Sequence, residues 1–345
     1  MKNEILDKIL KEKQTGELNR LDSVKIINDL FSGLMDRERD VLTRRFGLGG
    51  NKNETLEGIG HMHKLTRERV RQIEAASIKK IKKIENLDTY IKDLKSLIND
   101  LLEDHGGFLR KDFLLDILTV LASEIEDEKN IEIKKLNKLV YRKNFEFILS
   151  KILADDFETV SKVNQFNPLI KLKTEKIDHF EELADDLLNK IDSLRKTLST
   201  EELITLLKEL DAYNKYQEKL KRNATLDIFA IYKSKTFYDK AEIIHSNKIL
   251  YSLIQAIKNL ERNKFGHWGK ADWKEIKPRT INDKIYLVLK HEKKPLHFTE
   301  IAERINETAF DIKKANPATV HNELILDDRY ILVGRGTYAL KEWSK

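Results

Sequence analysis

Four side chains near the start of one expected helix have the chemistry that pairs with the edges of DNA bases. At about 100° per residue, a helix beginning at Thr66 places Arg67, Glu68, Arg71 and Gln72 within an arc of about 140°. Arginine can form two hydrogen bonds with guanine, glutamine can do so with adenine, and glutamate accepts one from cytosine. Because a major-groove helix contacts bases with its N-terminal residues, this arrangement predicts a base-reading helix.

The opposite side of the same helix is apolar. Val70 and Ile73 lie there, and Ile81 and Ile84 continue the stripe. Thr66 can cap the helix N-terminus, and its hydroxyl could also reach a DNA phosphate. One face is therefore expected to be buried and the other to be free.

A lysine-rich end follows the base-reading turns. The segment IKKIKK (78–83) contains Lys79 and Lys80, which are candidate phosphate contacts where a duplex backbone would pass. The same lysines could instead form a solvated last turn that complements the helix dipole. Both interpretations stay open.

A second, shorter helix is expected just upstream. The segment TLEGIGHMHK (55–64) begins with Thr55, a good N-cap, and directs Leu56 and Ile59 inward. Two short helices joined through residues 63–65 make a helix-turn-helix.

Other kinds of site chemistry are missing from the sequence. There is no Cys, which excludes disulfides, thiol nucleophiles and Cys-based zinc sites. His61 and His63 lack further metal ligands and are interpreted as exposed helix residues. The GLGG stretch (47–50) is not followed by Lys-Ser/Thr and lies between helices, unlike a phosphate-binding loop. We therefore predict no enzyme, no metal, no cofactor and no small-molecule substrate.

The bulk composition favours a mainly helical protein. Of 345 residues, 40% are hydrophobic and 35% are charged, with only 4 Pro and 13 Gly. The formal charge of +6 makes an acidic partner plausible. No signal peptide or membrane-spanning run is present, so a cytoplasmic, nucleoid-associated location is expected.

Residues 34–81, LMDRERDVLTRRFGLGGNKNETLEGIGHMHKLTRERVRQIEAASIKKI, resemble region 4 of the bacterial primary sigma factors. The resemblance implies that the four base-reading side chains contact a promoter −35 element and that the module docks on the RNA polymerase flap. It also implies a phosphate clamp formed by Arg37, Arg45 and the backbone of Thr55 and Leu56. Double-stranded DNA and core RNA polymerase are the partners it predicts.

The sequence departs from the sigma pattern in three places. Ala76 replaces a residue that is usually basic, which should weaken backbone contact. Gly58 and the HMH at 61–63 replace acidic and aliphatic residues, so the shorter helix is expected to be looser. The residues before Leu34 are too few for the segment that melts the −10 element. We therefore expect a protein that recognises promoter DNA but lacks the segment that melts it.

The C-terminal segment 280–343 has the order of a winged helix. A helix is expected at 282–290, a second from Glu300 with Thr299 as its cap, and a third from Pro317 to near Asp327. The strands YILV and TYAL then flank Gly334-Arg335-Gly336, a hairpin turn whose glycines allow positive φ.

This segment resembles the HARE-HTH family, whose relatives include the delta subunit of bacterial RNA polymerase. On that basis Thr319, His321 and Asn322 of the third helix could face DNA, and Arg335 at the wing tip could reach a phosphate. Winged helices also dock on proteins, and the Asp327-Asp328 pair mildly favours docking. The two interpretations stay open.

The middle of the chain shows a degenerate repeat. KPLHFTEI (294–301) aligns without gaps with KTLSTEEL (196–203) and GGFLRKDF (106–113), each expected to pass from a short extended stretch into a helix. LADDFETV (153–160) similarly echoes LDDRYILV (326–333). The repeat predicts additional winged helices, although coincidence is an equal explanation for the copy at 196–203.

The predicted organisation is therefore mainly α with small α+β modules. It comprises a helix and linker (1–20), the sigma-like helix-turn-helix (21–86), a helical middle (87–263), an ordered connector (264–279) and the winged helix (280–345). Within the middle, NPLIKLK (167–173) and LDIFAIYKS (226–234) are expected to be β-like.

Two main functional hypotheses follow. In the first, the protein is a sequence-specific transcription factor that reads a −35-like element. In the second, it is an accessory protein that docks on RNA polymerase and reads little DNA itself. A nuclease-like role of the middle region is a weaker third hypothesis.

Overall fold

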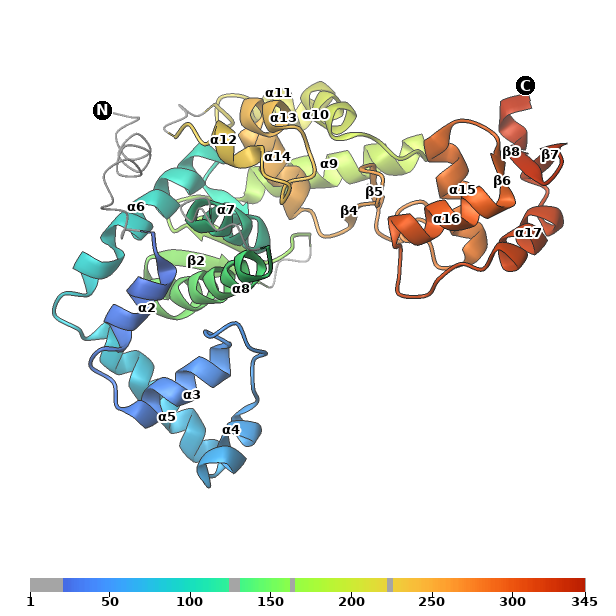
Figure 1. Cartoon of the computed structure of the whole chain (residues 1–345). Coiled ribbons are helices and arrows are strands. Elements are labelled where there is room, and N and C mark those ends of the chain that lie inside the picture. The colour runs from blue at the N-terminus through green and yellow to red at the C-terminus, as the bar shows by residue number, and fades with distance from the viewer. Residues whose placement is uncertain (1–20, 124–130, 162–164, 222–225, 345) are drawn as a thin grey trace. The chain divides into compact units, whose positions relative to one another are not determined.

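Helices dominate the computed structural model, which describes residues 21–123, 131–161, 165–221 and 226–344 (Figure 1). The helix and linker predicted at 1–20 lie outside the described residues. The chain forms two units: unit 1 combines 1–181 with 214–256, and unit 2 combines 182–213 with 257–345. The predicted boundaries at 86/87 and 263/264 fall inside these units and stay predictions.

Unit 1 begins with the helix-turn-helix module (Figure 1). Its helices are α2 (Ser23–Phe31), α3 (Asp36–Phe46), α4 (Leu56–His63) and α5 (Arg67–Lys82). The side-chain oxygen of Thr55 accepts a hydrogen bond from Gly58 N at 3.1 Å, and that of Thr66 accepts one from Arg69 N at 3.2 Å. Both expected N-caps are therefore confirmed.

A small core fixes the angle between α4 and α5. It contains one fully buried residue from each of three helices, namely Val41, Ile59 and Val70. Gly60 lets the two helices approach closely, because a Cβ there would lie 2.7 Å from the carbonyl oxygen of Leu65 in the turn.

The remainder of unit 1 contains a complete winged-helix order (Figure 1). The elements are α6 (Leu87–Asp104), β1 (Phe108–Arg110), α7 (Lys111–Ser123), α8 (Ile131–Phe147), the turns η1 (Ile148–Ile152) and η2 (Leu153–Asp155), β2 (Phe157–Val160) and β3 (Leu169–Leu172). The strands form an antiparallel sheet in the order β1-β3-β2.

The C-terminal part of unit 2 has the same order of elements. These are α15 (Ile281–Glu292), β6 (Leu296–His297), α16 (Phe298–Thr308), α17 (Pro317–Leu326), β7 (Tyr330–Gly334), β8 (Thr337–Leu340) and the final turn η3 (Lys341–Ser344). The sheet order is β6-β8-β7, which matches that of the first copy. The predicted C-terminal winged helix is confirmed.

One local prediction in this domain is wrong. His297, not Thr299, is the N-cap of α16: its ring accepts from Thr299 N, and Glu300 accepts from His297 N at 3.0 Å. This reciprocal pair begins the helix earlier than a threonine cap would. The prediction for the hairpin turn is borne out at Gly336, which has positive φ (66°). Gly334 does not, and it lies at a β-bulge that begins at Leu332.

A reduced third copy also lies in unit 2. Helix α9 (Asp178–Leu194), most of which lies in unit 2, leads to Leu198, which bridges to Trp268, and then to α10 (Thr200–Glu209). Strand β4 (Leu260–Arg262) pairs with β5 (Trp268–Lys270), so β5 is again the central strand. All three aligned segments thus pass from an extended stretch into a helix, as the repeat predicts.

The residues between α10 and β4 form short helices. These are α11 (Asp211–Tyr216), α12 (Phe229–Tyr232), α13 (Ala241–Ser246) and α14 (Lys248–Ala256). The β-like prediction for 226–234 is therefore wrong. Ile228, Ile231 and Tyr232 are buried at helical spacing, and burial on that side outweighs the β-branched composition. The β-like prediction for 167–173 is confirmed by β3.

A fully buried histidine joins α6 to α14 and α12. His105 Nδ1 lies 2.7 Å from Ser252 Oγ, and its Nε2 lies 2.9 Å from the Tyr232 hydroxyl oxygen. Because Ser252 donates to the Lys248 carbonyl at 2.8 Å, it accepts from His105 Nδ1–H, and Tyr232 donates to Nε2. Burial, together with the positive charge of Lys248, lowers the pKa of His105 to about 3.

We expect His105 to make folding sensitive to acid. In the unfolded chain His105 is protonated below pH 6.5, whereas in the folded chain it is protonated only below about pH 3. The contribution of His105 to the free energy of unfolding is therefore full above pH 6.5 and falls as the pH drops from 6.5 to about 3. The loss is at most about 1.4 kcal/mol per pH unit. Urea unfolding at pH 7.5 and 4.5 should show a smaller loss for H105Q than for the wild type or the exposed control H61Q. Equal losses in all three proteins would contradict the prediction.

Candidate nucleic-acid interface

The four base-reading candidates lie together on the exposed side of α5. Arg67, Glu68, Arg71 and Gln72 are all exposed, whereas Val70 on the other side is fully buried. The structure therefore brings together the residues that the sequence grouped, at the capped N-terminal turns of one helix.

These side chains are already organised among themselves. Arg71 Nη2 lies 2.7 Å from Glu68 Oε1, and Arg71 Nε lies 2.9 Å from Glu68 Oε2, so the guanidinium holds the carboxylate with two hydrogen bonds. Gln72 Nε2 donates to the same carboxylate at 3.4 Å. The bond from Arg71 lowers the pKa of Glu68. The exposed pair costs little to open, so either group can exchange its partner for a base edge.

The candidate phosphate contacts differ in exposure and in their partners within the module. Arg37 and Lys79 are exposed. Arg45 instead donates to the Glu54 carbonyl at 3.0 Å and pairs with Glu74 at 3.2 Å, and Lys80 pairs with Glu38 at 2.5 Å. These two cations therefore join elements within the module.

The remaining candidates are positioned by the helix starts. Thr66 and Thr55 use their hydroxyl oxygens as N-caps, and Leu56 is half-buried against the small core. Their first-turn N–H groups lie at helix N-termini, where an anion is favoured by the helix dipole.

One ion-pair network was missed from the sequence. Arg44 contacts Asp40 at 2.9 Å and Glu54 at 3.0 Å, and His63 Nε2 lies 2.6 Å from the same Asp40 carboxylate. Although burial acts the other way, the hydrogen bonds from Arg44 and His63 lower the pKa of Asp40. The interpretation of His63 as a merely exposed histidine is wrong, since it ties α4 to α3. The i,i+4 spacing of Asp40 and Arg44 was the available signal.

Part of the apolar surface of the module, the flank that contains Phe31 and Phe46, is covered by its own chain. The ring of Phe147, at the end of α8, lies 4.9 Å from that of Phe46 and 6.0 Å from that of Phe31. Helix α2 packs on α8, and the C-terminal part of α5 packs on η1. In unit 1 the third helix of the winged helix is therefore a docking surface for the helix-turn-helix module.

The candidates on the C-terminal winged helix differ in their surroundings. Thr319, Asn322 and Arg335 are exposed. His321 is half-buried, with its ring 4.6 Å from that of Phe298 and 5.9 Å from that of Tyr338. His321 therefore packs beside the core, and its freedom to reach a base is small.

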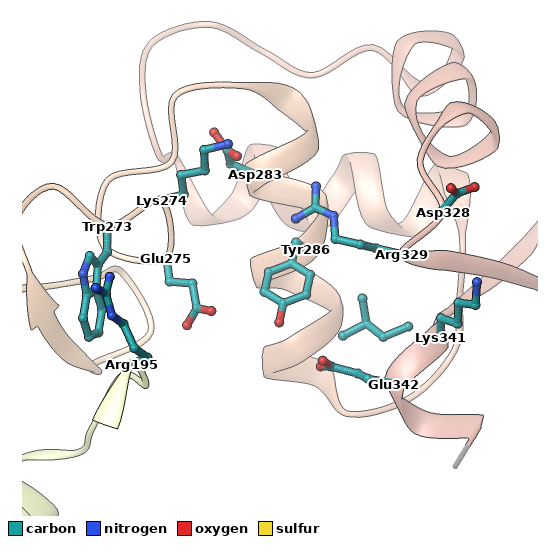
Figure 2. A pocket seen from close by; sticks show the side chains of 11 residues that line it. Arg195, Trp273, Lys274, Glu275, Asp283, Tyr286, Asp328, Arg329, Lys341 and Glu342 are labelled. Atoms are coloured by element: carbon teal, nitrogen blue, oxygen red, sulfur yellow. The ribbon is translucent and has the colours of Figure 1, made fainter. Parts of the chain in front are cut away.

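A groove of about 730 Å³ in unit 2 offers another surface (Figure 2). Its charged lining contains four cations and four anions: Arg195, Lys274, Arg329, Lys341, Glu275, Asp283, Asp328 and Glu342. Arg329 is bound to Asp327 at 2.8 Å and lies 5.2 Å from the Tyr286 ring centroid, while Glu275 pairs with Lys290 at 3.0 Å. With its charges balanced and several internally paired, the groove offers no phosphate site.

The described ranges contain no group of three or more His, Asp or Glu side chains that could hold a metal ion. None of the helices in the same ranges has the length and apolar composition that a bilayer crossing requires.

Comparison with known proteins supports both resemblances. Residues 30–83 match the family model described as sigma-70, region 4. Residues 279–343 match the HARE-HTH family model, a helix-turn-helix domain described from ASXL proteins and restriction endonucleases, among others. No solved structure matches the chain.

Curated proteins similar to the N-terminal region include RNA polymerase sigma factors. RNA polymerase sigma factor SigA of Lactococcus lactis subsp. cremoris is 45% identical over 71 residues, which are 21% of this chain and 20% of the relative. SigA of Listeria monocytogenes is 45% identical over 56 residues (16% and 15%), and SigA1 of Synechococcus elongatus is 46% identical over 56 (16% and 14%). The chain thus spans a fifth or less of the length of these relatives.

We expect F147A to loosen the helix-turn-helix module. Removing a buried phenylalanine should lower the free energy of unfolding by about 3–5 kcal/mol, because its contacts with Phe31 and Phe46 are lost. L139A on the exposed side of the same helix is the control and should cost less than about 1 kcal/mol. Denaturant unfolding measures both changes. A cost for F147A no larger than that of the control would show that this contact does not hold the module.

Proposed function

We propose that this protein is a DNA-binding transcription factor that acts with RNA polymerase and reads a −35-like promoter element through α5. The observation that carries the proposal is the exposure of Arg67, Glu68, Arg71 and Gln72 on one face of a capped helix. That helix lies inside the segment that matches sigma-70 region 4. A protein with this function works at the nucleoid.

The proposed mechanism consists of DNA binding alone, with no catalytic step. Exposed cations such as Arg37 and Lys79 supply salt-dependent attraction to phosphates and set the register of the helix. Each good bidentate contact from the base-reading face then adds about 1–3 kcal/mol of discrimination between bases. The Glu68–Arg71 pair holds both side chains over the same turn before DNA arrives, which limits the entropy lost on binding.

Association with RNA polymerase accompanies DNA reading in this proposal and is not an alternative to it. The matched relatives are named RNA polymerase sigma factors, which is the ground for expecting polymerase as a partner. The accessory-protein alternative needs an apolar docking surface away from α5. In unit 1, Phe31 and Phe46 on that flank are already in contact with Phe147. Direct DNA reading is therefore the better-supported main function.

We expect R71A to weaken binding to a duplex that carries TTGACA. Loss of about 1–3 kcal/mol corresponds to a roughly 5- to 150-fold higher Kd. Fluorescence anisotropy at several salt concentrations, with a scrambled duplex in parallel, measures the change. R69A removes the same charge from the same helix about 60° outside the base-reading arc, together with a hydrogen bond from Arg69 Nη1 to Gln72 Oε1 at 3.2 Å. It should weaken binding to TTGACA clearly less than R71A does. Identical behaviour of R71A and R69A would remove the proposed groove contact.

We expect E68A to relax base preference more than it lowers affinity. Glu68 can accept from cytosine, and its removal also deletes a negative charge near the phosphates. Competition with duplexes that vary one base pair at a time should show a flatter profile for E68A than for the wild type. An unchanged profile would mean that Glu68 serves only to hold Arg71.

A further inference from the structure

Arg45 joins three elements of the helix-turn-helix module. It lies in the last turn of α3, which ends before Gly47. Its Nη1 donates to the Glu54 carbonyl oxygen at 3.0 Å, and its Nε donates to Glu74 Oε2 on α5 at 3.2 Å. Because Glu54 directly precedes Thr55, the N-cap of α4, one guanidinium connects the end of α3, the start of α4 and the middle of α5.

The point on which Arg45 is braced is itself fixed. The N–H of Glu54 donates to the Arg44 carbonyl oxygen at 3.0 Å, and the Glu54 carboxylate accepts from Arg44 Nη1 at 3.0 Å. The bond from Arg45 to the carbonyl oxygen adds a third contact to the same residue. Arg45 can therefore hold α5 in place, because its other partner is anchored to the end of α3.

Glu74 lies at the border between the buried side and the base-reading side of α5. At 100° per residue it is about 40° from Val70 in the small core and about 20° from Arg67 on the reading face. Its side chain is 15% exposed and that of Arg45 is 35% exposed. A cation bound at this border controls how far the reading face is turned toward DNA.

Without Arg45, the Glu74 carboxylate would compete with DNA for the reading face. Arg71 lies three residues before Glu74, a spacing at which opposite charges on a helix attract each other. The pKa of Arg71 is raised most by its hydrogen bond with Glu68, and the negative charge of Glu74 adds to the rise. Arg45 thus also keeps Glu74 from drawing Arg71 away from a base.

The same pairing makes Arg45 a poor phosphate ligand. A cation gains affinity for DNA because it neutralises a phosphate and releases the counterions around it. The charge of Arg45 is already balanced by Glu74 within the fold. Arg37 lies on the same helix and is exposed, so it is the natural comparison.

We propose that Arg45 is a positioning residue, which orients α5 for base reading through Glu74 and Glu54 and does not bind phosphate. The proposal rests on the −35 reading proposed for α5. It departs from the phosphate clamp that the sigma resemblance implies for Arg45, and it leaves Arg37 as the side chain of α3 in that clamp.

Fluorescence anisotropy of the full chain with the TTGACA and scrambled duplexes, at several salt concentrations, tests the proposal. The ratio of the two Kd values measures base discrimination. R45A and E74A should each lower this ratio at least about fivefold, and R45A/E74A should lower it no further than either single change, because all three remove the same tie. Circular dichroism confirms that each variant is folded.

The slope of log Kd against log salt separates positioning from phosphate binding. R45A should keep the slope of the wild type, because no counterion release is lost. R37A removes the same charge from the same helix and should reduce the slope by about 0.9, the value for one phosphate contact.

Two results would overturn the proposal. R45A could reduce the salt slope as R37A does and weaken both duplexes alike, with E74A binding both more tightly because it frees Arg45; Arg45 would then be a phosphate ligand. Alternatively, R45A and E74A could keep the discrimination of the wild type, which would limit the pair to a structural role.

Failure of the −35 reading gives a different result. A wild type that binds both duplexes with equal affinity would refute that reading, and the positioning role of Arg45 with it. The salt slope of R45A would then still show whether Arg45 binds phosphate.

Discussion

The orientation of α5 about its own axis is the constraint on which the rest of the candidate site depends. Val70 is locked into the small core with Val41 and Ile59, and Ile81 enters the main core of unit 1. These two positions are eleven residues apart, or about three helical turns, so they anchor the same side of the helix at both ends. The side that carries Arg67 and Arg71 is thereby held in solvent, and the exposure of the proposed reading face is a consequence of what the opposite face buries.

The C-terminal end of α5 is held by the first winged helix, which here has a structural role. In unit 1, α8 and η1 cover α2 and the end of α5, with Phe147 between Phe31 and Phe46. A third helix used in this way cannot also lie in a DNA groove. In the C-terminal copy the outward side of the equivalent helix α17 is exposed. The same topology therefore presents a different surface in each copy. What binds to a winged helix is decided by its surface side chains, not by the order of its elements.

The positions of the charged side chains distinguish the surfaces that could bind nucleic acid better than the net charge of the chain does. Several cations that could have been counted toward DNA affinity, including Arg44, Arg45 and Lys80, have carboxylate partners within the module. The groove in unit 2 balances its charges in the same way. The exposed candidates for nucleic acid in this module include Arg67 and Arg71 at the start of α5, with Arg37 and Lys79 farther from it. Such a set suits selective contact better than general attraction to phosphate.

Many local features of this protein follow from its sequence alone. Side-chain periodicity around Thr66 predicts the capped helix and its two faces, and the spacing of extended stretches and helix starts predicts the repeated winged-helix order. These features depend on neighbours within a few residues, which is why the chain reveals them. Where a local rule competed with packing it failed: residues 228–232 look like a strand and form the helix α12, because burial on one helical side outweighs their composition.

The availability of each surface, in contrast, is a property of the folded chain. Nothing near Phe147 in the sequence indicates that it packs on Phe46, about a hundred positions earlier, and nothing near His63 indicates its bond to Asp40. Such contacts join residues that are distant in the chain, and their free energy depends on burial that arises only after folding. The sequence identified which side chains could bind DNA, and the fold determined which of them remain exposed to do so.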